Sequence, residues 1–509
     1  MKASRGVVAA GHPKTAEAAT AALAAGGNAF DAAIAACCAA CVAEPVLASL
    51  GGGGFLLGKP ANGEPILYDF FTQTPHRKRS EGETNLKPVI VDFGDATQEF
   101  HIGLGAIATP GAIAGLFAVH RDLCRIPLAE LVAPACAFAR HGLILNDAQH
   151  QLATIVEPII RTSPDAFAPH ASPERPANLA VPGETVRQPA LADALEALVT
   201  EGPGLFYEGE WAERVVTDCA HEGGHLTRED LSGYRVERRA PLTLGYRGSR
   251  VLTNPPPALG GALILFALRL LGETELSAHS RGDASHIHAV ATAMRLTQRL
   301  RREGLAGADT DLLKTEILRL MRREAVFPRG TTQISVADAE GSLASLTISN
   351  GEGSGYVVPG TGIVLNNMLG EEDINPQGFH RWPTNRRISS MMSPTLLELA
   401  DGTAVVTGSS GSNRIRSAVL QVISNLVDFA LPLDQAVAAP RIHFEGELLN
   451  LEPPVPPAAL EALTAHWPQI RLWSGLSVFF GGAHSVSRGA DGGLDGAGDP
   501  RRGGVARFV

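Results

Sequence analysis

Two runs of alternating apolar and polar residues flank a short turn at Ala339-Glu340-Gly341. Ile334 and Val336 lie on the first run, and Leu343 begins the second. Alternation with a period of two is typical of strands, and a short turn containing glycine joins two such strands into a hairpin. The pair Thr331-Thr332 opens this hairpin, so two hydroxyl groups stand at the head of a strand.

Hydrophobic spacing elsewhere predicts helices and further strands on both sides of this hairpin. The predicted helices span 14–25, 28 or 31 to about 42, 261–271, 285–303 and 415–429, and 110–272 is mostly helical. The predicted strands follow the glycine run 51–54 and span 67–71, parts of 239–253, 362–365, 395–399 and 404–407. The polar segment 79–101 predicts an exposed loop. Strands in both halves with flanking helices predict a layered α/β fold.

The composition restricts the class of protein. The 509 residues predict two to four domains or one large fused domain, and 45% hydrophobic with 19% charged residues indicates a large core. A net charge of -10 argues against a nucleic-acid partner, since phosphate binding needs a basic surface. The Ala-rich run 16–43 is interrupted by Gly, Asn and Asp, so it predicts no membrane span. The first residues have no apolar signal region, and we expect a cytoplasmic protein.

The cysteines and histidines give little sign of a metal site. None of the six cysteines lies in a CxxC pair that has a matching second pair, so zinc is not expected. Cys38 and Cys41 lie in an Ala-rich helix and are interpreted as small core residues with reduced thiols. His286 and His288 are two residues apart on a predicted helix, face different sides, and are interpreted as structural.

Thr331 is the candidate nucleophile. If the chain is cut between Gly330 and Thr331, the new α-amine of Thr331 can act as the base for its own hydroxyl. A glycine before the cut removes steric bulk from the bond. The alternative is that Thr-Thr merely begins a strand, where threonine is favoured.

The wider sequence resembles the γ-glutamyltranspeptidase family of N-terminal-nucleophile hydrolases. The resemblance rests on motifs that occur in order from Gly6 to about Pro500: GHPKTAEAATAALAAGGNAFDAAIAACCAACVAEPVLASLGGGGFLL, ATPGAIAGL, GTTQISVADAEGSLASLT, PGTGIVLNNML, RRISSMMSPT and VTGSSGSNRIRSAVLQVISNLVDFAL. It implies a four-layer αββα sandwich made as one precursor. Autocleavage would give a large chain, 1–330, and a small chain, 331–509, that remain intertwined.

The resemblance also implies roles for several residues. Ser349 would support the nucleophile, and Gly411-Ser412 would form the oxyanion loop, with serine in place of the usual second glycine. Ser389 and Ser390 would bind the α-carboxylate of a γ-glutamyl group, and the glycine-rich segment from Asn350 to Gly355 would shape the substrate pocket. The alternatives are a plain strand end for Ser349, a glycine turn for the loop and a polar turn for the serine pair.

Three departures from the family pattern concern the substrate pocket. Phe71 stands where the family has an arginine for the substrate carboxylate, and phenylalanine cannot replace that bidentate contact. Met368 replaces the amide that receives the substrate amino group, although Glu371 could still supply a carboxylate. The usual Thr-Thr-His that starts the small chain reads Thr-Thr-Gln. The candidates for a substitute cation are Arg77, Arg79, Arg386 and Arg387; the alternative is that they are solvated surface charges.

Three functions remain open on these grounds. The first is a γ-glutamyl amide hydrolase or transpeptidase that passes the acyl group to water or an amine. The second is an amidase, acylase or C–C acyl hydrolase on a non-glutamyl substrate, which the phenylalanine at 71 favours. The third is an uncleaved, non-catalytic homologue. The resemblance implies a small-molecule substrate and no cofactor. It also implies that the large and small chains come from one precursor and stay together, and it is compatible with a homodimer of these two-chain units.

Overall fold

Two antiparallel sheets form the centre of the computed structural model, which describes residues 4–92, 97–303, 330–371, 375 and 378–509. The first sheet has seven strands in the order β22 (Val505–Phe508), β1 (Gly6–Ala10), β11 (Thr332–Asp338), β12 (Leu343–Ser349), β2 (Gly53–Lys59), β3 (Ile66–Phe70) and β8 (Glu237–Arg239). The second has six strands in the order β21 (Leu494–Ala497), β20 (Ser485–Arg488), β16 (Ala404–Thr407), β15 (Thr395–Glu398), β10 (Ser249–Thr253) and β9 (Leu242–Tyr246).

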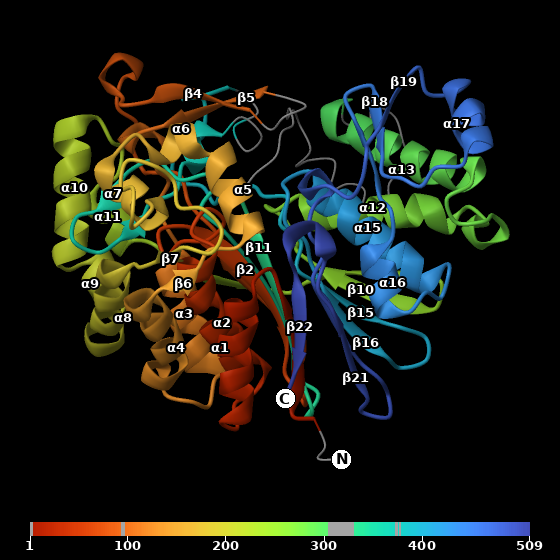
Figure 1. Cartoon of the computed structure of the whole chain (residues 1–509), viewed down its shortest axis with the longest axis horizontal. Helices are drawn as coiled ribbons and strands as arrows, with labels where there is room; N and C mark the ends of the chain where they lie inside the picture. The colour runs from red at the N-terminus through yellow and green to blue at the C-terminus, as the bar shows by residue number, and fades with distance from the viewer. Residues whose placement is uncertain (1–3, 93–96, 304–329, 372–374, 376–377) are drawn as a thin grey trace.

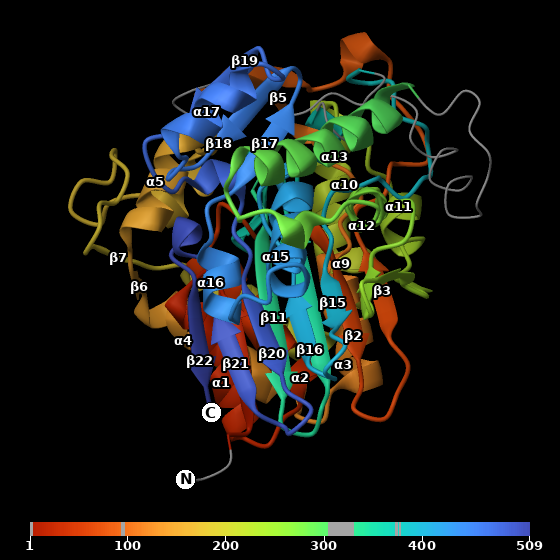
Figure 2. The ribbon, with the colours of Figure 1, turned by 90° about the vertical axis from the view of Figure 1, so that its right-hand side faces the viewer.

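Helices cover the outer faces of both sheets (Figure 1). The helices beside the first sheet include α1 (Pro13–Ala24), α2 (Ala29–Ala43), α3 (Ala112–Leu123), α4 (Leu128–His141), α8 (Pro189–Glu201), α9 (Gly204–Tyr207), α10 (Glu210–Glu222) and α11 (Arg228–Ser232). Those beside the second sheet include α12 (Gly260–Gly272), α13 (Ala284–Glu303), α15 (Arg414–Val427) and α16 (Leu433–Ala438). Figure 2 shows the second sheet and its helices from the front.

Smaller elements surround these layers. They are the hairpins β4 (Lys87–Asp92) with β5 (Thr97–Ile102), β6 (Leu143–Ile144) with β7 (Thr185–Val186), and β13 (Val357–Val358) with β14 (Ile363–Val364); the sheet of β17 (Ile442–Glu445), β18 (Leu448–Leu451) and β19 (Gln469–Leu472); and the helices α5 (Asp147–Ile155), α6 (Glu157–Ile160), α7 (Pro164–Phe167) and α17 (Pro457–Thr464).

Two large hydrophobic clusters hold the layers together. One lies between the first sheet and its helices; the other runs from the opposite face of that sheet through the second sheet to α12, α13 and α15. Adjacent strand residues enter different clusters: Leu56 belongs to the first, whereas Phe55 and Leu57 belong to the second. The predicted mixed α/β fold is confirmed.

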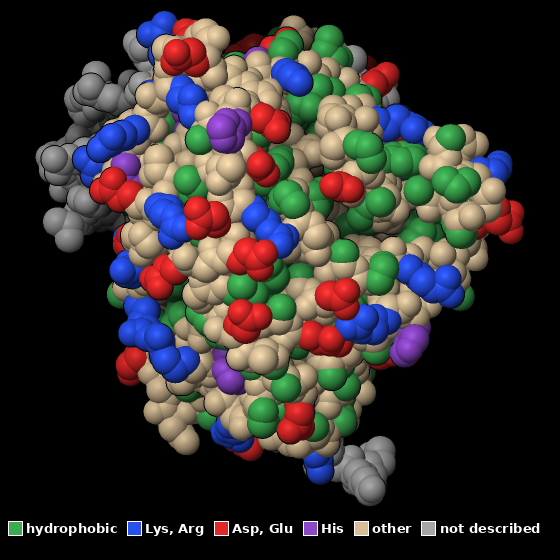
Figure 3. Space-filling model, turned by 90° about the vertical axis from the view of Figure 1, so that its left-hand side faces the viewer, with side chains coloured by type: hydrophobic (Ala, Val, Ile, Leu, Met, Phe, Trp, Pro, Cys, Tyr) green, Lys and Arg blue, Asp and Glu red, His purple; other side chains and the backbone are tan. Residues whose placement is uncertain are grey.

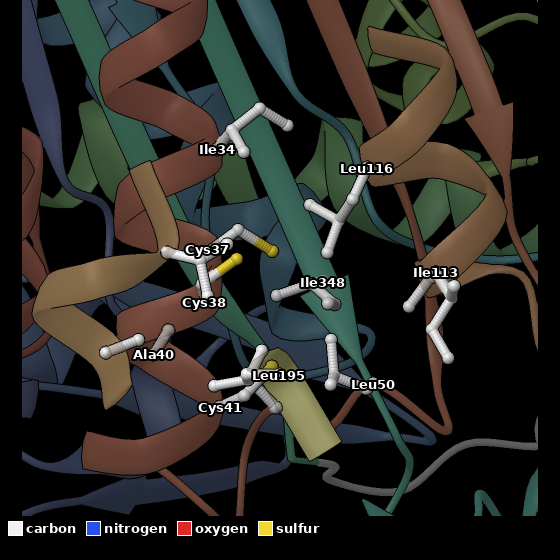
Figure 4. Close-up of a cluster of buried hydrophobic side chains, with 14 of the residues drawn as sticks. Ile34, Cys37, Cys38, Ala40, Cys41, Leu50, Ile113, Leu116, Leu195 and Ile348 are labelled. Atoms are coloured by element: carbon white, nitrogen blue, oxygen red, sulfur yellow. The ribbon is translucent and has the colours of Figure 1, made fainter. Parts of the chain in front are cut away.

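Helix α2 is buried on every side by the first cluster, and most of its residues are small. All fifteen of its residues are buried, and Asn28 with Asp31 forms a capping box at its start. Cys38 and Cys41 lie within this core, in the same cluster as Ile348 of the first sheet (Figure 4). All six cysteines are free thiols in the structure, and all except the half-buried Cys124 are buried.

The β11–β12 hairpin forms as predicted, and the glycine run brings β2 against it. Thr332 pairs with Ile348 and Ala337 with Leu343. β2 pairs with the other edge of β12, from Ser349 opposite Gly53 to Leu343 opposite Lys59. A Cβ atom on Gly52 would lie 2.3 Å from the carbonyl oxygen of Ser349, so only glycine allows this approach.

Other helix and strand predictions were right within a few residues, but the prediction of a loop over 79–101 was wrong. This segment contains a short 3₁₀ helix (Glu81–Glu83) and the β4–β5 hairpin. Val91, Phe100 and Ile102 pack on Ile159 in a small separate cluster. The opposite face of the hairpin is exposed, which made the segment read as polar. The strand predicted at 362–365 is only the two-residue β14, and β1, which lies between β22 and β11 in the first sheet, was not predicted.

The segments before and after residue 330 are interleaved. β1, β2, β3 and β8 share the first sheet with β11, β12 and β22, and β9 and β10 share the second with four later strands. None of the described helices is long and apolar enough to cross a membrane. Basic and acidic side chains are interspersed over the face drawn in Figure 3.

Candidate functional site

The peptide unit between Gly330 and Thr331 lies buried at one end of the first sheet. Thr331 is 3% exposed and directly precedes β11. The register that pairs Thr332 with Ile348 places Ser349 opposite Thr331. The Ser349 hydroxyl donates a hydrogen bond of 2.5 Å to the carbonyl oxygen of Gly330. The candidate nucleophile therefore lies next to a carbonyl group that is already polarised by a donor.

Gly330 is enclosed by backbone atoms. A Cβ atom at this position would lie 2.5 Å from the carbonyl oxygen of Gly351 and 2.8 Å from that of Val46. The N–H of Gly330 donates a hydrogen bond of 2.9 Å to Oε1 of Glu352. Both the N–H and the C=O of Gly330 thus have a side-chain partner, and the position has no room for a side chain.

Thr332 belongs to a different hydrogen-bond network, on the helix-facing side of the sheet. Its hydroxyl donates to Oε2 of Glu44 at 2.7 Å, and the Thr15 hydroxyl donates to Oε1 at 2.7 Å. Burial raises the pKa of the Glu44 carboxyl, an effect that the two hydroxyl donors and the charge of Arg502 partly offset. This carboxylate ties α1 and the end of α2 to the start of β11.

A small pocket lies beside the threonine pair. Its lining comprises Gly11, Glu44, Leu47, Ala148, Gln149, Leu152, Thr331, Thr332, Ser410, Val478, His484 and Arg502. Burial lowers the pKa of the Arg502 guanidinium to about 10, which leaves it protonated at neutral pH. Burial also lowers the pKa of His484 to about 4, and its Nδ1 accepts the N–H of Asp499 at 3.2 Å. The pocket is therefore lined by a cation, a neutral imidazole and a carboxyl group.

The proposed oxyanion loop borders the same pocket through Ser410. Gly411 has φ 103° and Ser412 has φ 55°, so the serine adopts the left-handed conformation that the usual glycine would adopt freely. Helix α15 begins at Arg414, immediately after this loop, and its N-terminal dipole favours negative charge there. Ser412 thus has a left-handed backbone, a conformation that glycine adopts more readily than serine.

Gln333, the residue that departs from the family's Thr-Thr-His, bridges the two strands of the hairpin. Its amide nitrogen donates to the Ser345 hydroxyl at 3.0 Å, and its amide oxygen accepts from the Thr347 hydroxyl at 2.6 Å. Ser345 in turn donates to the carbonyl oxygen of Thr407 in the second sheet. Gln333, which follows the threonine pair, therefore has a structural role: it links the two strands of the hairpin.

Phe71 lies on the other side of Thr331 from the Arg502 pocket. Extending the β2–β3 register places Phe71 opposite Gly53, which is itself opposite Ser349. At about 4.8 Å per strand, its backbone is roughly 14 Å from Thr331. The Phe71 ring is 1% exposed and stacks on Phe55, with ring centroids 5.4 Å apart, in the core between the sheets.

The four candidate substitute cations do not fill the place of the missing arginine. Arg387 lies against the backbone of Phe71, but it donates to the carbonyl oxygens of Phe71 and Arg235 and to the Tyr234 hydroxyl, and it pairs with Asp69 at 3.5 Å. Arg79 donates to two backbone carbonyl oxygens near the end of α10, and Arg77 and Arg386 are exposed.

The remaining predicted substrate residues lie in two places. Ser389 and Ser390 follow Ile388, whose N–H donates to the carbonyl oxygen of Thr72, so the pair adjoins the Phe71 end of the site. The Ser390 hydroxyl accepts the N–H of Met392, whereas the Ser389 hydroxyl is buried without a hydrogen-bond partner among the described residues. The Ser390 hydroxyl thus accepts one backbone N–H, a contact that does not use its own O–H as a donor.

The second place is the open end of the β11–β12 hairpin, which holds Asn350, Met368 and Glu371. The amide of Asn350 is fully buried and makes no hydrogen bond within the described parts of the chain. Glu371 is also fully buried, and its Oε1 would lie 2.0 Å from a Cβ atom on Gly351. Met368 is part of the core between the sheets. The amide of Asn350 therefore directly follows Ser349, and the carboxylate of Glu371 lies against Gly351.

No group of three or more possible metal ligands occurs in the described residues. His286 accepts the N–H of Gly282 at Nδ1, and His288 packs against His466 and Trp467. The two histidines have separate environments, which agrees with the structural role predicted for them.

Glu44, Glu352, His484 and Arg502 were not identified as site residues from the sequence. A carboxylate at the end of an apolar helix, as in Glu44, is a signal that could have been used, because unpaired glutamate is rarely buried. Glu352 is a single acidic residue in a glycine-rich segment. His484 and Arg502 carry no local signal, since only the fold brings the C-terminal segment beside Thr331.

Comparisons with known proteins agree with this arrangement. Residues 15–509 match the family model described as gamma-glutamyltranspeptidase. The chain is 29% identical to the Acylase ACY 1 proenzyme of Pseudomonas sp. (strain SE83), covering 97% of this chain and 92% of that one. It is 29% identical to the Glutathione hydrolase proenzyme of Escherichia coli (strain K12), covering 98% and 91%.

A solved structure supports the same assignment. The cephalosporin acylase from Bacillus halodurans superimposes with a TM-score of 0.83 at 26% identity, covering 99% of this chain and 96% of that one. The similarity extends over both sheets and their helices, and the family match includes the hairpin that begins at Thr331. The chain belongs to the γ-glutamyltranspeptidase family.

Proposed function

We propose that this enzyme is an N-terminal-threonine amide hydrolase or acyltransferase of the αββα N-terminal-nucleophile type. It cuts itself between Gly330 and Thr331 into chains 1–330 and 331–509. The observation that carries the proposal is the hydrogen bond from the Ser349 hydroxyl to the carbonyl oxygen of Gly330, beside the buried Thr331. The relatives named as proenzymes support a maturation step of this kind.

Maturation requires one intramolecular acyl shift and one hydrolysis. The Thr331 hydroxyl attacks the carbonyl carbon of Gly330, the C–N bond breaks, and the hydroxyl proton ends on the Thr331 nitrogen. Water then hydrolyses the resulting ester, which releases the Gly330 carboxylate and restores the hydroxyl. Thr331 now has a free α-amine that can accept its hydroxyl proton during turnover.

Turnover uses the same nucleophile on a substrate amide. The Thr331 hydroxyl attacks the substrate carbonyl, the amine part leaves with a proton, and an ester to Thr331 forms. Backbone N–H groups at Gly411 and Ser412 are the candidate donors for the oxyanion, helped by the N-terminus of α15. Water or an amine then attacks the ester and takes the acyl group.

The geometry favours a substrate other than a γ-glutamyl amide. Phe71 fills the arginine position with a buried, stacked ring, and the nearest guanidinium, that of Arg387, is engaged by Asp69, Tyr234 and two backbone carbonyls. The contact that would bind an α-carboxylate is therefore absent at this position. We infer an acyl group that is less polar at this end than glutamate.

Two assays test the proposal in sequence. A denaturing gel of freshly purified protein should show two chains whose sizes fit a break before Thr331, and Thr331→Ala should give one. A single band in both proteins would instead support an uncleaved, non-catalytic homologue. The mature enzyme should then release aniline faster from a pentanoyl anilide than from a γ-glutamyl anilide, with or without an acceptor dipeptide. Faster release from the γ-glutamyl anilide would instead support the function of a γ-glutamyl amide hydrolase or transpeptidase.

A further inference from the structure

We propose that Glu352 is a positioning residue for self-cleavage, a role that rests on the proposed function. Its Oε1 accepts the N–H of Gly330 at 2.9 Å, while the Ser349 hydroxyl holds the carbonyl group of the same residue at 2.5 Å. Glu352 therefore binds the N–H of Gly330, and Ser349 binds its C=O. The residue whose carbonyl is attacked is fixed by these two side chains.

A glycine before the cut creates the need for such a clamp. The carbonyl oxygens of Gly351 and Val46 exclude any side chain at residue 330. Glycine, however, moves more freely about its backbone bonds than any other residue. Without anchors, the Gly330 carbonyl would sample orientations in which the Thr331 hydroxyl cannot reach its carbon. The two hydrogen bonds restore the orientation that a side chain would otherwise help to fix.

The surroundings of Glu352 hold its carboxylate in place. Glu352 is 5% exposed, and its own N–H donates to the side-chain oxygen of Asn367 at 3.0 Å. Gly351 and Gly353 on either side have φ of 67° and 83°, so the backbone turns sharply around it. Arg502 supplies a positive charge that attracts this carboxylate. The acceptor is thus fixed before cleavage begins.

Glu352 takes no part in the bonds that form or break. The Thr331 oxygen bonds to the Gly330 carbon, the Gly330–Thr331 C–N bond breaks, and the proton passes from that oxygen to that nitrogen. Glu352 acts earlier, by orienting the carbonyl. Its loss should slow formation of the ester and leave hydrolysis of the ester unaffected.

The test follows cleavage of the full chain after synthesis in a cell-free system. Glu352→Met removes the acceptor at similar side-chain length, and Glu352→Gln keeps an oxygen acceptor. We expect cleavage at least tenfold slower in the Met variant and within about threefold of wild type in the Gln variant. Glu340→Ala, in the turn at the far end of the same hairpin, is the matched control and should cleave at the wild-type rate.

Two further measurements separate positioning from a general loss of structure. In the uncleavable Thr331→Ala background, Glu352→Met and Glu352→Gln should each unfold in one cooperative transition, and both should melt below Thr331→Ala alone because both remove the charge that faces Arg502. Hydroxylamine, which intercepts esters, should not restore the rate of Glu352→Met, because the defect precedes the ester. Restoration by hydroxylamine, equal rates in the Met variant and wild type, or a Gln variant as slow as Met would overturn the proposal. Failure of the wild-type chain to cleave would instead defeat the proposed function.

Discussion

The Ser349 hydroxyl hydrogen-bonds the carbonyl oxygen of Gly330 across the open end of the β11–β12 hairpin. This contact joins two residues that lie nineteen positions apart. It exists because the hairpin turn sets a register in which Ser349 stands opposite Thr331. A hydroxyl donor on a carbonyl that is about to be attacked stabilises the negative charge that develops on its oxygen.

Removing this donor should slow self-cleavage. For Ser349→Ala we expect a rate about 10²–10³-fold lower, the usual effect of losing one oxyanion donor. Ser349→Thr keeps the hydroxyl and should cleave much faster than the alanine variant. The fraction of cut chain is followed over time on a denaturing gel. Equal rates for Ser349→Ala and wild type would show that the hydrogen bond has no catalytic effect.

A methyl group at residue 330 should also impair maturation. Gly330→Ala places a Cβ atom 2.5 Å and 2.8 Å from two backbone carbonyl oxygens, so the scissile unit must shift. We expect the uncut chain to accumulate, as measured by intact mass. The control is Gly245→Ala, since a Cβ atom there meets nothing within 4 Å. Normal cleavage in Gly330→Ala would mean that the crowding at this position does not matter.

Replacing Phe71 by the arginine that the family has at this position should not by itself create γ-glutamyl activity. Phe71→Arg would remove the stacking on Phe55 and place a charge in the core between the sheets, at a cost of about 2 kcal/mol or more. We expect a lower melting temperature and no gain of γ-glutamyl anilide turnover. Phe508→Arg, at an exposed phenylalanine, should leave the melting temperature nearly unchanged. A gain of γ-glutamyl activity in Phe71→Arg would show that the pocket can still receive a glutamate.

Four buried histidines should make the fold sensitive to mild acid. His12, His225, His286 and His484 each accept a backbone N–H at Nδ1, and burial lowers the pKa of each ring to about 4. Because the unfolded rings titrate near 6.5, folding favours the neutral form. The stabilisation is complete above pH 6.5 and is lost as pH falls from 6.5 towards 4, by up to about 3 kcal/mol per ring.

One of these rings can be tested apart from the site. His286→Gln removes one titrating group and should make the fall in melting temperature between pH 6.5 and 4.5 shallower. His141→Gln, at an exposed histidine, should leave that fall unchanged. If the two variants respond alike, protonation of the buried rings does not set the acid sensitivity.

Local signals in the sequence located many elements up to α15, whereas none of the elements after it was predicted. The capping box at Asn28 and the hairpin turn at 339–341 are encoded by neighbouring residues, so α2 and β11–β12 were predicted closely. Ser349 was assigned from the resemblance to the family and not from a local signal, and the structure's register places it opposite Thr331. The β4–β5 hairpin was misread because it buries one face in a small separate cluster and exposes the other. β1 is a short strand whose partner, β11, lies more than three hundred residues away in the chain.

The rest of the site depends on contacts with no local pattern. Thr332 meets Glu44 across 288 positions, and Arg502 enters the pocket from the C-terminal segment. The sequence showed that the arginine at position 71 is missing. It could not show that Arg387 is held by Asp69 and Tyr234, because that depends on the packing of three separate segments.

The central claim is that Thr331 becomes the first residue of a new chain. Intact-mass analysis with N-terminal sequencing of freshly purified wild-type protein tests it directly. We predict two chains, with the smaller beginning Thr-Thr-Gln-Ile-Ser, and a single full-length chain for Thr331→Ala. An active wild-type protein whose Gly330–Thr331 bond is intact would contradict the account.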